Sequence, residues 1–313
     1  MTLRPALFFI PAVILAVFHA LPVFTQEPGI PFPNSRFDTI DGFSVHYRVW
    51  NERSESPPGN ILFVHGFAGS TFCFRDLYDT LAALGYRIIA VDIPGAGYSS
   101  RSLDFNQSFS HRGIFLWKLI DQVQKGRPAR WTLVGHSMGG GTAEAMAILR
   151  PEQTEKLILI AGTVFRKTTN LTHTATFLLR QENLRKILVD FADRNLITYR
   201  RFGKLLKSAY RRKPDSSEVL GYLTPLEIRG SAEALVNVYI NNRETEGLDA
   251  RNLGNVPVYA IWGTRDSWIP LRSARMYFNA FPIFALVKIK GAGHMPMETH
   301  IRQFIPPFLE FID

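Results

Sequence analysis

The sequence contains very little cysteine: Cys73 is the single one among 313 residues. One thiol cannot form an intramolecular disulfide, and it also excludes CxxC redox motifs and most metal–thiolate sites. Internal repeats and low-complexity tracts are absent as well. Hydrophobic residues make up 46% of the chain and charged residues 20%, which is ordinary for a folded protein. The length suits one large domain, with or without an insertion.

Charged residues are missing from residues 6–24, which contain no Asp, Glu, Lys or Arg. An apolar run after a short positive start, here Arg4, is typical of a secretory signal sequence. The run also approaches the ~20 residues of a membrane-spanning helix, although Pro11 and Pro22 each remove a helical hydrogen bond. We predict that residues 1–26 are a signal peptide or a membrane anchor, with a helix of the folded core as a third alternative. Either of the first two places the rest of the chain outside the cytoplasm, as a secreted, periplasmic or membrane-anchored protein.

Acidic residues are scarce between Arg166 and Lys213, where thirteen Lys or Arg stand against three Asp or Glu. This segment carries a charge of +10 and the whole chain +9, so the remainder is close to neutral. Each Lys or Arg near an anionic bilayer adds about 1 kcal/mol of attraction. The segment is therefore a candidate for docking on an anionic membrane surface, with a solvated charged surface as the simpler alternative. No RNA- or DNA-binding motif accompanies it, so we expect no nucleic-acid partner.

Short apolar runs of four or five residues recur along the chain. Without alternation, runs of this length suit strands that are buried on both faces, as in a parallel sheet. Residues with helical spacing fill most of the gaps, and Asp41-Gly42 between two alternating runs predicts an antiparallel hairpin in Arg36–Trp50. The sequence thus predicts an α/β fold with a doubly wound, mostly parallel sheet. The predicted strands are 61–64, 87–91, 131–134, 157–160, 258–262 and 285–289, and the predicted helices include 77–84, 114–123 and 142–149.

The alternation of strands and helices fails once, between Thr163 and Val258. Much of this stretch has apolar residues at helical spacing and no clear strand. We predict an inserted helical subdomain at residues 165–231, which contains the basic segment. The α/β core then comprises residues 27–164 and 232–313.

Gly135-His136-Ser137-Met138-Gly139 matches the pattern G-x-S-x-G. A predicted strand ends just before it and a predicted helix opens just after it. A serine on so tight a turn needs small neighbours, because the strained backbone leaves no room for Cβ atoms. The turn exposes the hydroxyl and points the positive end of the helix at any oxyanion formed there. Ser137 is therefore the candidate nucleophile, and a glycine-rich turn that merely packs is the alternative.

A serine hydroxyl needs a base to take its proton. His294 follows the last predicted strand, at the sheet edge where catalytic groups of open α/β folds gather. Asp266 follows the preceding strand and lies between serine and histidine in the chain, so it can hold the imidazole in the required tautomer. The alternatives are a surface-loop histidine and an ion pair of Asp266 with Arg265. Glu298 is the fallback acid.

A tetrahedral oxyanion needs two backbone N–H donors, and losing one usually costs ~3 kcal/mol of transition-state stabilisation. Met138, directly after the nucleophile, is the first candidate. The second is Phe67, because it follows His65-Gly66 in the loop after a predicted strand. His65 itself is expected to have a structural hydrogen-bonding role.

Together, in this order and spacing, these motifs make the chain from about residue 36 to its end resemble the α/β-hydrolase superfamily. The matching segments are His65-Gly66, Asp92-x-x-Gly95-x-Gly97-x-Ser99, Gly135–Gly139, Gly263–Asp266 and Gly293-His294. The resemblance implies a serine esterase or lipase with a helical cap, here residues 165–231, over its site. So basic a cap is not a requirement of that fold.

The resemblance also implies what the protein acts on. We expect Ser137, Asp266 and His294 to cleave a small-molecule or lipid ester through an acyl-enzyme, without a metal or cofactor. The same triad remains compatible with carbon–carbon bond hydrolysis, haloperoxidase-like perhydrolysis and acyl transfer. A weakly catalytic member that binds a ligand and signals is a further alternative, because fold membership does not name the substrate.

Overall fold

The computed structural model describes residues 30–126, 129–162, 181–241, 248–272 and 283–313. The predicted export segment, residues 1–26, lies outside these ranges. Among the described helices, none combines the length and the apolar character that crossing a bilayer requires.

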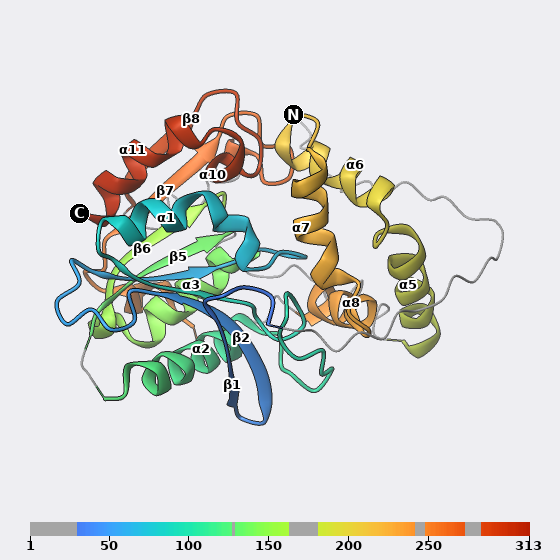
Figure 1. Cartoon of the computed structure of the whole chain (residues 1–313), viewed down its shortest axis with the longest axis horizontal. Helices are drawn as coiled ribbons and strands as arrows, with labels where there is room; N and C mark the ends of the chain where they lie inside the picture. Colours follow the sequence, from blue (N-terminus) through green and yellow to red (C-terminus); the bar gives the residue numbers. More distant parts are fainter. Residues whose placement is uncertain (1–29, 127–128, 163–180, 242–247, 273–282) are drawn as a thin grey trace, which may run out of the picture.

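Across the described ranges, eight strands form one sheet (Figure 1), and their order is β1-β2-β4-β3-β5-β6-β7-β8. The first two strands, β1 and β2, form the expected antiparallel hairpin around Asp41-Gly42, and both turn residues have positive φ. β2 also pairs antiparallel with β4, whereas every neighbouring pair from β4 to β8 is parallel. The predicted mostly parallel α/β sheet is confirmed. The strands are β1 (Ser35–Ile40), β2 (Phe43–Trp50), β3 (Asn60–Val64), β4 (Arg87–Val91), β5 (Trp131–His136), β6 (Thr154–Ile160), β7 (Val258–Gly263) and β8 (Ile283–Ile289).

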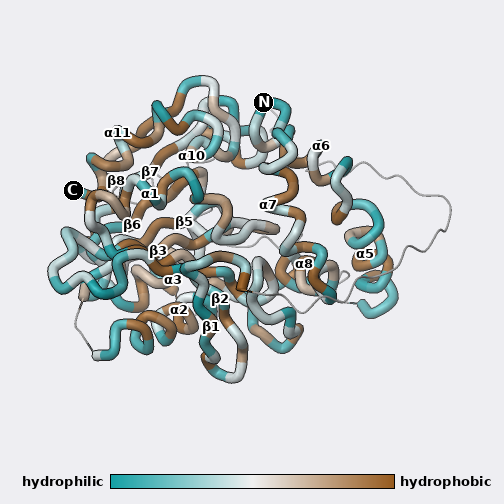
Figure 2. The backbone as a smooth tube through the Cα atoms, in the orientation of Figure 1, coloured by the Kyte–Doolittle hydropathy of each residue, from teal (hydrophilic) through white to brown (hydrophobic). Residues whose placement is uncertain are grey.

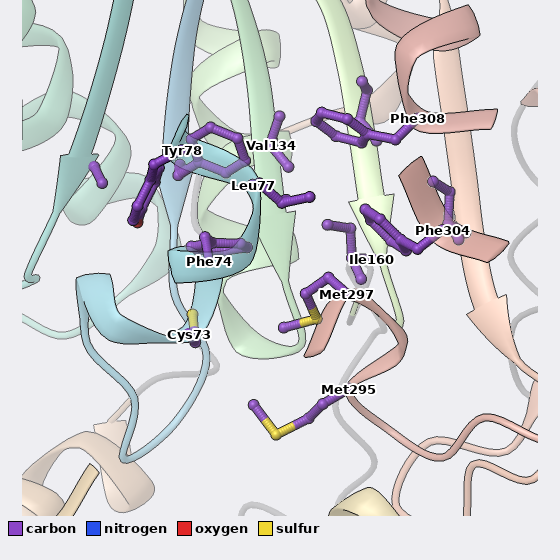
Figure 3. Close-up of a cluster of buried hydrophobic side chains, with 14 of the residues drawn as sticks. Cys73, Phe74, Leu77, Tyr78, Val134, Ile160, Met295, Met297, Phe304 and Phe308 are labelled. Carbon is purple, nitrogen blue, oxygen red and sulfur yellow. The ribbon is translucent and has the colours of Figure 1, made fainter. Parts of the chain in front are cut away.

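Helices cover both faces of the sheet, because adjacent residues of a strand point to opposite sides. On one face, Ile61 and Phe63 of β3 pack with side chains of α1 and α11. Figure 3 shows part of this cluster, with Leu77 of α1 and Phe308 of α11. On the other face, Leu62 and Val64 pack with side chains of α2 and α3. The central strands are correspondingly hydrophobic in Figure 2. The α-helices and 3-10 helices (η) of the α/β core are η1 (Thr71–Phe74), α1 (Arg75–Ala83), α2 (Phe109–Gln124), α3 (Met138–Leu149), η2 (Pro151–Gln153), η3 (Ala250–Leu253), α10 (Pro296–Thr299) and α11 (Ile301–Ile312).

In the part of the chain that the structure describes, four α-helices are inserted between β6 and β7, and we call them the cap. They are α5 (Glu182–Asn195), α6 (Tyr199–Tyr210), α7 (Ser216–Leu226) and α8 (Ser231–Asn241). Figure 1 shows them together beside the sheet. Ala192 of α5 packs with Ala232, Val236 and Ile240 of α8. The limits of 165 and 231 stay a prediction: residues 163–180 lie outside the described part of the chain, and the name cap extends here beyond 231 to the end of α8 at Asn241.

The cap is joined to the core by the apolar face of α6. Phe202, Leu206 and Tyr210 are buried in the same hydrophobic cluster as α1 and α11. Helix α7 also lies very close to the core: a Cβ added at Gly221 would stand 2.1 Å from the Phe72 ring of η1. These contacts hold α6 and α7 in a fixed position at the carboxyl edge of the sheet.

Candidate active site

Ser137 occupies the sharp turn between β5 and α3. Its backbone has φ 52° and ψ −122°, a strained conformation for a residue other than glycine. A Cβ added at Gly139 would lie 2.2 Å from the Val64 carbonyl oxygen, and one added at Gly135 would lie 2.4 Å from that of Gly139. The two glycines of G-x-S-x-G are therefore required by the close approach of the backbone.

His294 and Asp266 form a continuous hydrogen-bonded chain with Ser137. The imidazole Nε2 lies 2.9 Å from Ser137 Oγ, and Nδ1 lies 2.8 Å from Asp266 Oδ2. His294 and Asp266 are both buried, with exposed fractions of 2% and 7%. In the arrangement that satisfies both bonds, Nδ1–H donates to the carboxylate and Nε2 accepts from the hydroxyl.

The Asp266 carboxylate is held by the backbone of its own loop. Its other oxygen, Oδ1, accepts hydrogen bonds from the N–H groups of Trp268 at 2.8 Å and Ile269 at 2.9 Å. Within the described residues it forms no ion pair with Arg265, the alternative partner. Three hydrogen bonds thus fix the carboxylate so that one oxygen faces the imidazole.

His294 is positioned by groups that the sequence did not indicate. Its backbone N–H donates to the carbonyl of Ala209 in α6 at 2.8 Å. Its carbonyl accepts from Nε2 of His136 at 3.0 Å, and burial lowers the pKa of His136 well below its ordinary value, so this ring is a neutral donor. The Trp268 ring stacks on the imidazole at 5.2 Å. The cap and the serine turn therefore both set the place of His294.

The loop after β3 lies directly against the nucleophile. A Cβ added at Gly66 would stand 2.9 Å from Ser137 Cβ. His65 is fully buried, donates from Nδ1 to the Gly66 carbonyl at 2.7 Å and accepts at Nε2 from the N–H of Ile93 at 3.1 Å. Burial lowers its pKa, which keeps the ring neutral for these two bonds. The structure confirms this structural role, and Phe67 and Met138 remain the candidate oxyanion donors.

Comparison with known proteins decides the family. The sequence model of the alpha/beta hydrolase fold family matches residues 59–301. The chain belongs to the α/β-hydrolase fold family. This membership supports an enzyme of the α/β-hydrolase type, and it leaves the reaction open because the fold hosts many chemistries.

Relatives of this α/β-hydrolase have diverse names. An uncharacterized hydrolase, YugF, of Bacillus subtilis is 28% identical, over 87% of this chain and 98% of its own. The dihydrolipoyllysine-residue acetyltransferase component of the acetoin cleaving system of Cupriavidus necator is 30% identical, over 86% of this chain and 66% of its own. Among solved structures, Cfl2 of Burkholderia cenocepacia is 21% identical and has a TM-score of 0.70, covering 89% of this chain and 95% of its own. At that identity, the last likeness shows the fold alone.

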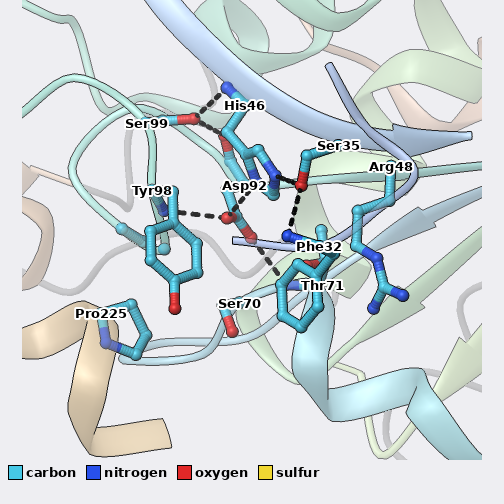
Figure 4. A network of polar contacts seen from close by, with 12 residues as sticks. Phe32, Ser35, His46, Arg48, Ser70, Thr71, Asp92, Tyr98, Ser99 and Pro225 are labelled. Atoms are coloured by element: carbon cyan, nitrogen blue, oxygen red, sulfur yellow. Dashed lines mark hydrogen bonds and ion pairs between the residues drawn. The ribbon is translucent and has the colours of Figure 1, made fainter. Parts of the chain in front are cut away.

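A second Ser–His–Asp chain lies in the core of this α/β-hydrolase (Figure 4). His46 donates from Nδ1 to Asp92 Oδ2 at 2.7 Å, and its Nε2 lies 2.8 Å from Ser35 Oγ. The side chains of His46 and Asp92 are completely buried. Ser35 also accepts a hydrogen bond from the N–H of Phe32. These hydrogen bonds have the same Ser–His–Asp order as the candidate triad. Because the residues are buried in the core, they form a structural network.

Asp92 is the centre of that network. Its Oδ1 accepts from the N–H of Thr71 at 2.6 Å and its Oδ2 from the N–H of Tyr98 at 2.9 Å. Burial by itself would raise the pKa of Asp92, but the hydrogen bond and charge of His46 outweigh it and lower the pKa below the ordinary value. The carboxylate thereby connects the loop after β4 to Thr71, the first residue of η1. The loop that begins at Gly66 ends at the same residue. The D-x-x-G-x-G-x-S motif marked Asp92, but no pattern indicated His46 or Thr71 as its partners.

Glu298, the fallback acid, has other partners than the imidazole of His294, whose Nδ1 bonds to Asp266. Its buried carboxylate accepts hydrogen bonds from the hydroxyls of Tyr210 in α6 and Tyr222 in α7, and it pairs with Arg75 of α1. Burial raises its pKa, while Arg75 and the two hydroxyls act in the opposite direction. Glu298 therefore ties the cap to the core four residues after His294, so this side chain is a positioning group for the cap.

Proposed function

We propose that this α/β-hydrolase cleaves a carboxylic ester through an acyl-enzyme. The proposal is carried by one observation: the unbroken hydrogen-bonded chain from Ser137 through His294 to Asp266 at the carboxyl edge of the sheet. Ser137 is the nucleophile, His294 the general base and Asp266 the acid that orients it. Such a chain makes a neutral hydroxyl reactive at ordinary pH.

The reaction has two halves. Ser137 Oγ attacks the ester carbonyl while its proton passes to His294 Nε2, and the resulting imidazolium is stabilised by Asp266. The backbone N–H groups of Met138 and Phe67 stabilise the oxyanion of the tetrahedral intermediate. The intermediate then expels the alcohol, which takes the proton from Nε2 and leaves an acyl group on Oγ.

Water completes the cycle by the same route. Nε2 of His294 takes a proton from the water as it attacks the acyl carbonyl. The second tetrahedral intermediate releases the carboxylic acid, and the proton on Nε2 returns to Ser137 Oγ. Bonds and protons balance without a metal or a redox partner.

Acyl transfer is the second candidate, and the acetyltransferase name of the Cupriavidus necator relative favours it. The two reactions share the acyl-enzyme and differ only in the acceptor of the second half, which is water or another nucleophile. The acyl and alcohol parts of the ester can belong to a small molecule or to a lipid.

Turnover of short-chain p-nitrophenyl esters tests the proposal. We expect release of p-nitrophenol together with an equal amount of free carboxylic acid. The yield of free acid should not fall when a primary alcohol or a thiol is added as an acyl acceptor. Protein inactivated beforehand with a fluorophosphonate is the control. Recovery of the acyl group mainly on the added acceptor would favour acyl transfer, and turnover no faster than in the control would exclude both reactions.

A further inference from the structure

An open hollow of about 460 Å³ lies beside the candidate active site, and its lining is strongly cationic. Four of the five lining residues carry positive charge, the fifth is a serine, and none is acidic. Three of the cations come from α6 and its C-terminal cap, and the fourth from the loop after β7. The lining residues are Lys204, Lys207, Ser208, Arg211 and Arg265.

The fold keeps these cations together. Lys204 and Lys207 lie one turn apart on α6, on the side opposite the buried Phe202 and Leu206, and Arg211 is the exposed C-cap residue of the same helix. Because that apolar side is fixed in the core, α6 cannot rotate to separate the charges. Attraction to the helix C-terminus can account for Lys207 and Arg211, but it does not explain why Arg265 of another element joins them.

The cations of the cluster have no ion-pair partner within the described part of the chain. None of the four cations there forms an ion pair, although other exposed basic residues do, such as Lys118 with Asp41 and Lys186 with Glu182. Like charges that are held close together raise the free energy of the protein, and a bound anion lowers it again. The hollow is therefore suited to an anionic group.

The donors in the hollow match a phosphate group in particular. Arginine guanidinium groups bind phosphate oxygens in pairs, and lysine ammonium groups add point charges. A phosphate monoester carries close to two negative charges at neutral pH and offers three strong acceptor oxygens. One carboxylate would neutralise only a quarter of the four charges, so phosphate is the better complement.

The hollow is linked to the candidate triad by two short connections. Arg265 directly precedes Asp266 in the chain. Ser208 Oγ accepts a hydrogen bond from Trp268 Nε1 at 3.2 Å, and the Trp268 ring stacks on His294. We propose that this hollow is an anion-binding site that holds the phosphate group of a ligand next to the active site. The phosphate group is a monoester, and it belongs either to the headgroup of phosphatidic acid or to a soluble phosphate monoester.

Binding is best measured on the full chain with Ser137→Ala, so that the result does not depend on the proposed ester chemistry. One probe is vesicles that contain phosphatidic acid against vesicles of phosphatidylcholine alone, by co-sedimentation. This comparison removes any contribution of the apolar residues 6–24, which does not depend on headgroup charge. The other probe is glycerol 3-phosphate against glycerol, by titration calorimetry.

The site variant replaces Lys204, Lys207 and Arg211 by glutamine, and Arg265→Gln removes the fourth charge from the other element. The matched control removes three exposed charges elsewhere, by Arg53→Gln, Arg229→Gln and Arg302→Gln. We expect the site variant to weaken binding of the phosphate-bearing probe by at least about tenfold and Arg265→Gln by about threefold to tenfold. The control should stay within about twofold of the parent, and all variants should keep the parent's unfolding midpoint.

Each outcome decides the proposal. Selective binding of the phosphatidic acid vesicles alone supports the site and identifies a lipid headgroup, whereas binding of glycerol 3-phosphate supports it and identifies a soluble ester. Failure to bind either phosphate-bearing probe overturns it. Equal losses in the site and control variants also overturn it, because net charge alone would then explain the attraction.

Discussion

Replacing Ser137 by alanine is expected to lower kcat for p-nitrophenyl ester hydrolysis by about four to six orders of magnitude. The reason is that the members of such a triad act as a unit, so that removing one removes nearly all of the covalent pathway. Alanine keeps the backbone of the turn and deletes only Oγ, which lies 2.9 Å from His294 Nε2. The measurement is steady-state kinetics, with the unfolding midpoint as a check that the protein is intact.

The chain supplies a matched control in Ser35. Its Oγ also lies 2.8 Å from an imidazole Nε2, that of His46, which in turn bonds to a carboxylate. Because this second Ser–His–Asp network is buried in the core, Ser35→Ala is expected to leave kcat within about tenfold of the parent. An intact Ser137→Ala protein that keeps more than about one hundredth of the parental kcat would contradict the assignment of the nucleophile.

Replacing Asp92 by alanine is expected to lower the free energy of unfolding by about 3–5 kcal/mol. The change leaves three donors without their acceptor, namely the buried His46 Nδ1 and Thr71 N–H and the partly buried Tyr98 N–H. Urea denaturation measures the effect. The control is Asp121→Ala, because Asp121 forms a partly exposed ion pair with Arg150, and such pairs contribute about 1 kcal/mol or less.

The effect of Asp92→Ala should also depend on pH in a defined direction. The pKa of Asp92 in the folded protein lies below its ordinary value of 3.8. A carboxyl whose pKa is lowered by folding stabilises the protein above its unfolded pKa and loses that contribution as the pH falls through the folded pKa. The stability difference between parent and variant should hold at neutral pH and shrink only below about pH 4. A difference that is small at neutral pH would show that the network is not a main source of stability.

The sheet could be predicted from the sequence because its signals are local. Arg87–Val91 was expected as a strand with the bounds that β4 has in the structure, since an apolar run of that length has few other stable environments. The serine turn could be predicted as well. At positions 135 and 139 another backbone segment comes so close that only glycine fits. The hairpin at Asp41-Gly42 follows the same logic, since both residues need positive φ.

The partners of buried polar groups could not be predicted in this way. Glu298 lies near His294 in the chain and looked like a substitute acid, yet its carboxylate bonds to Arg75, Tyr210 and Tyr222 from three other helices. The stacking of Trp268 on His294 and the bond from His294 to Ala209 also depend on how the cap meets the core. Such contacts are set by tertiary packing between residues far apart in the chain, and a periodic pattern carries no information about them.

Mass spectrometry of the intact protein during turnover of p-nitrophenyl acetate, followed by peptide mapping, tests the central claim most directly. The account predicts a transient acetyl group on the peptide that contains Ser137, formed and lost at rates consistent with kcat and absent from Ser137→Ala. Turnover without any acyl-protein, or an acetyl group on another residue that accounts for the full rate, would contradict it.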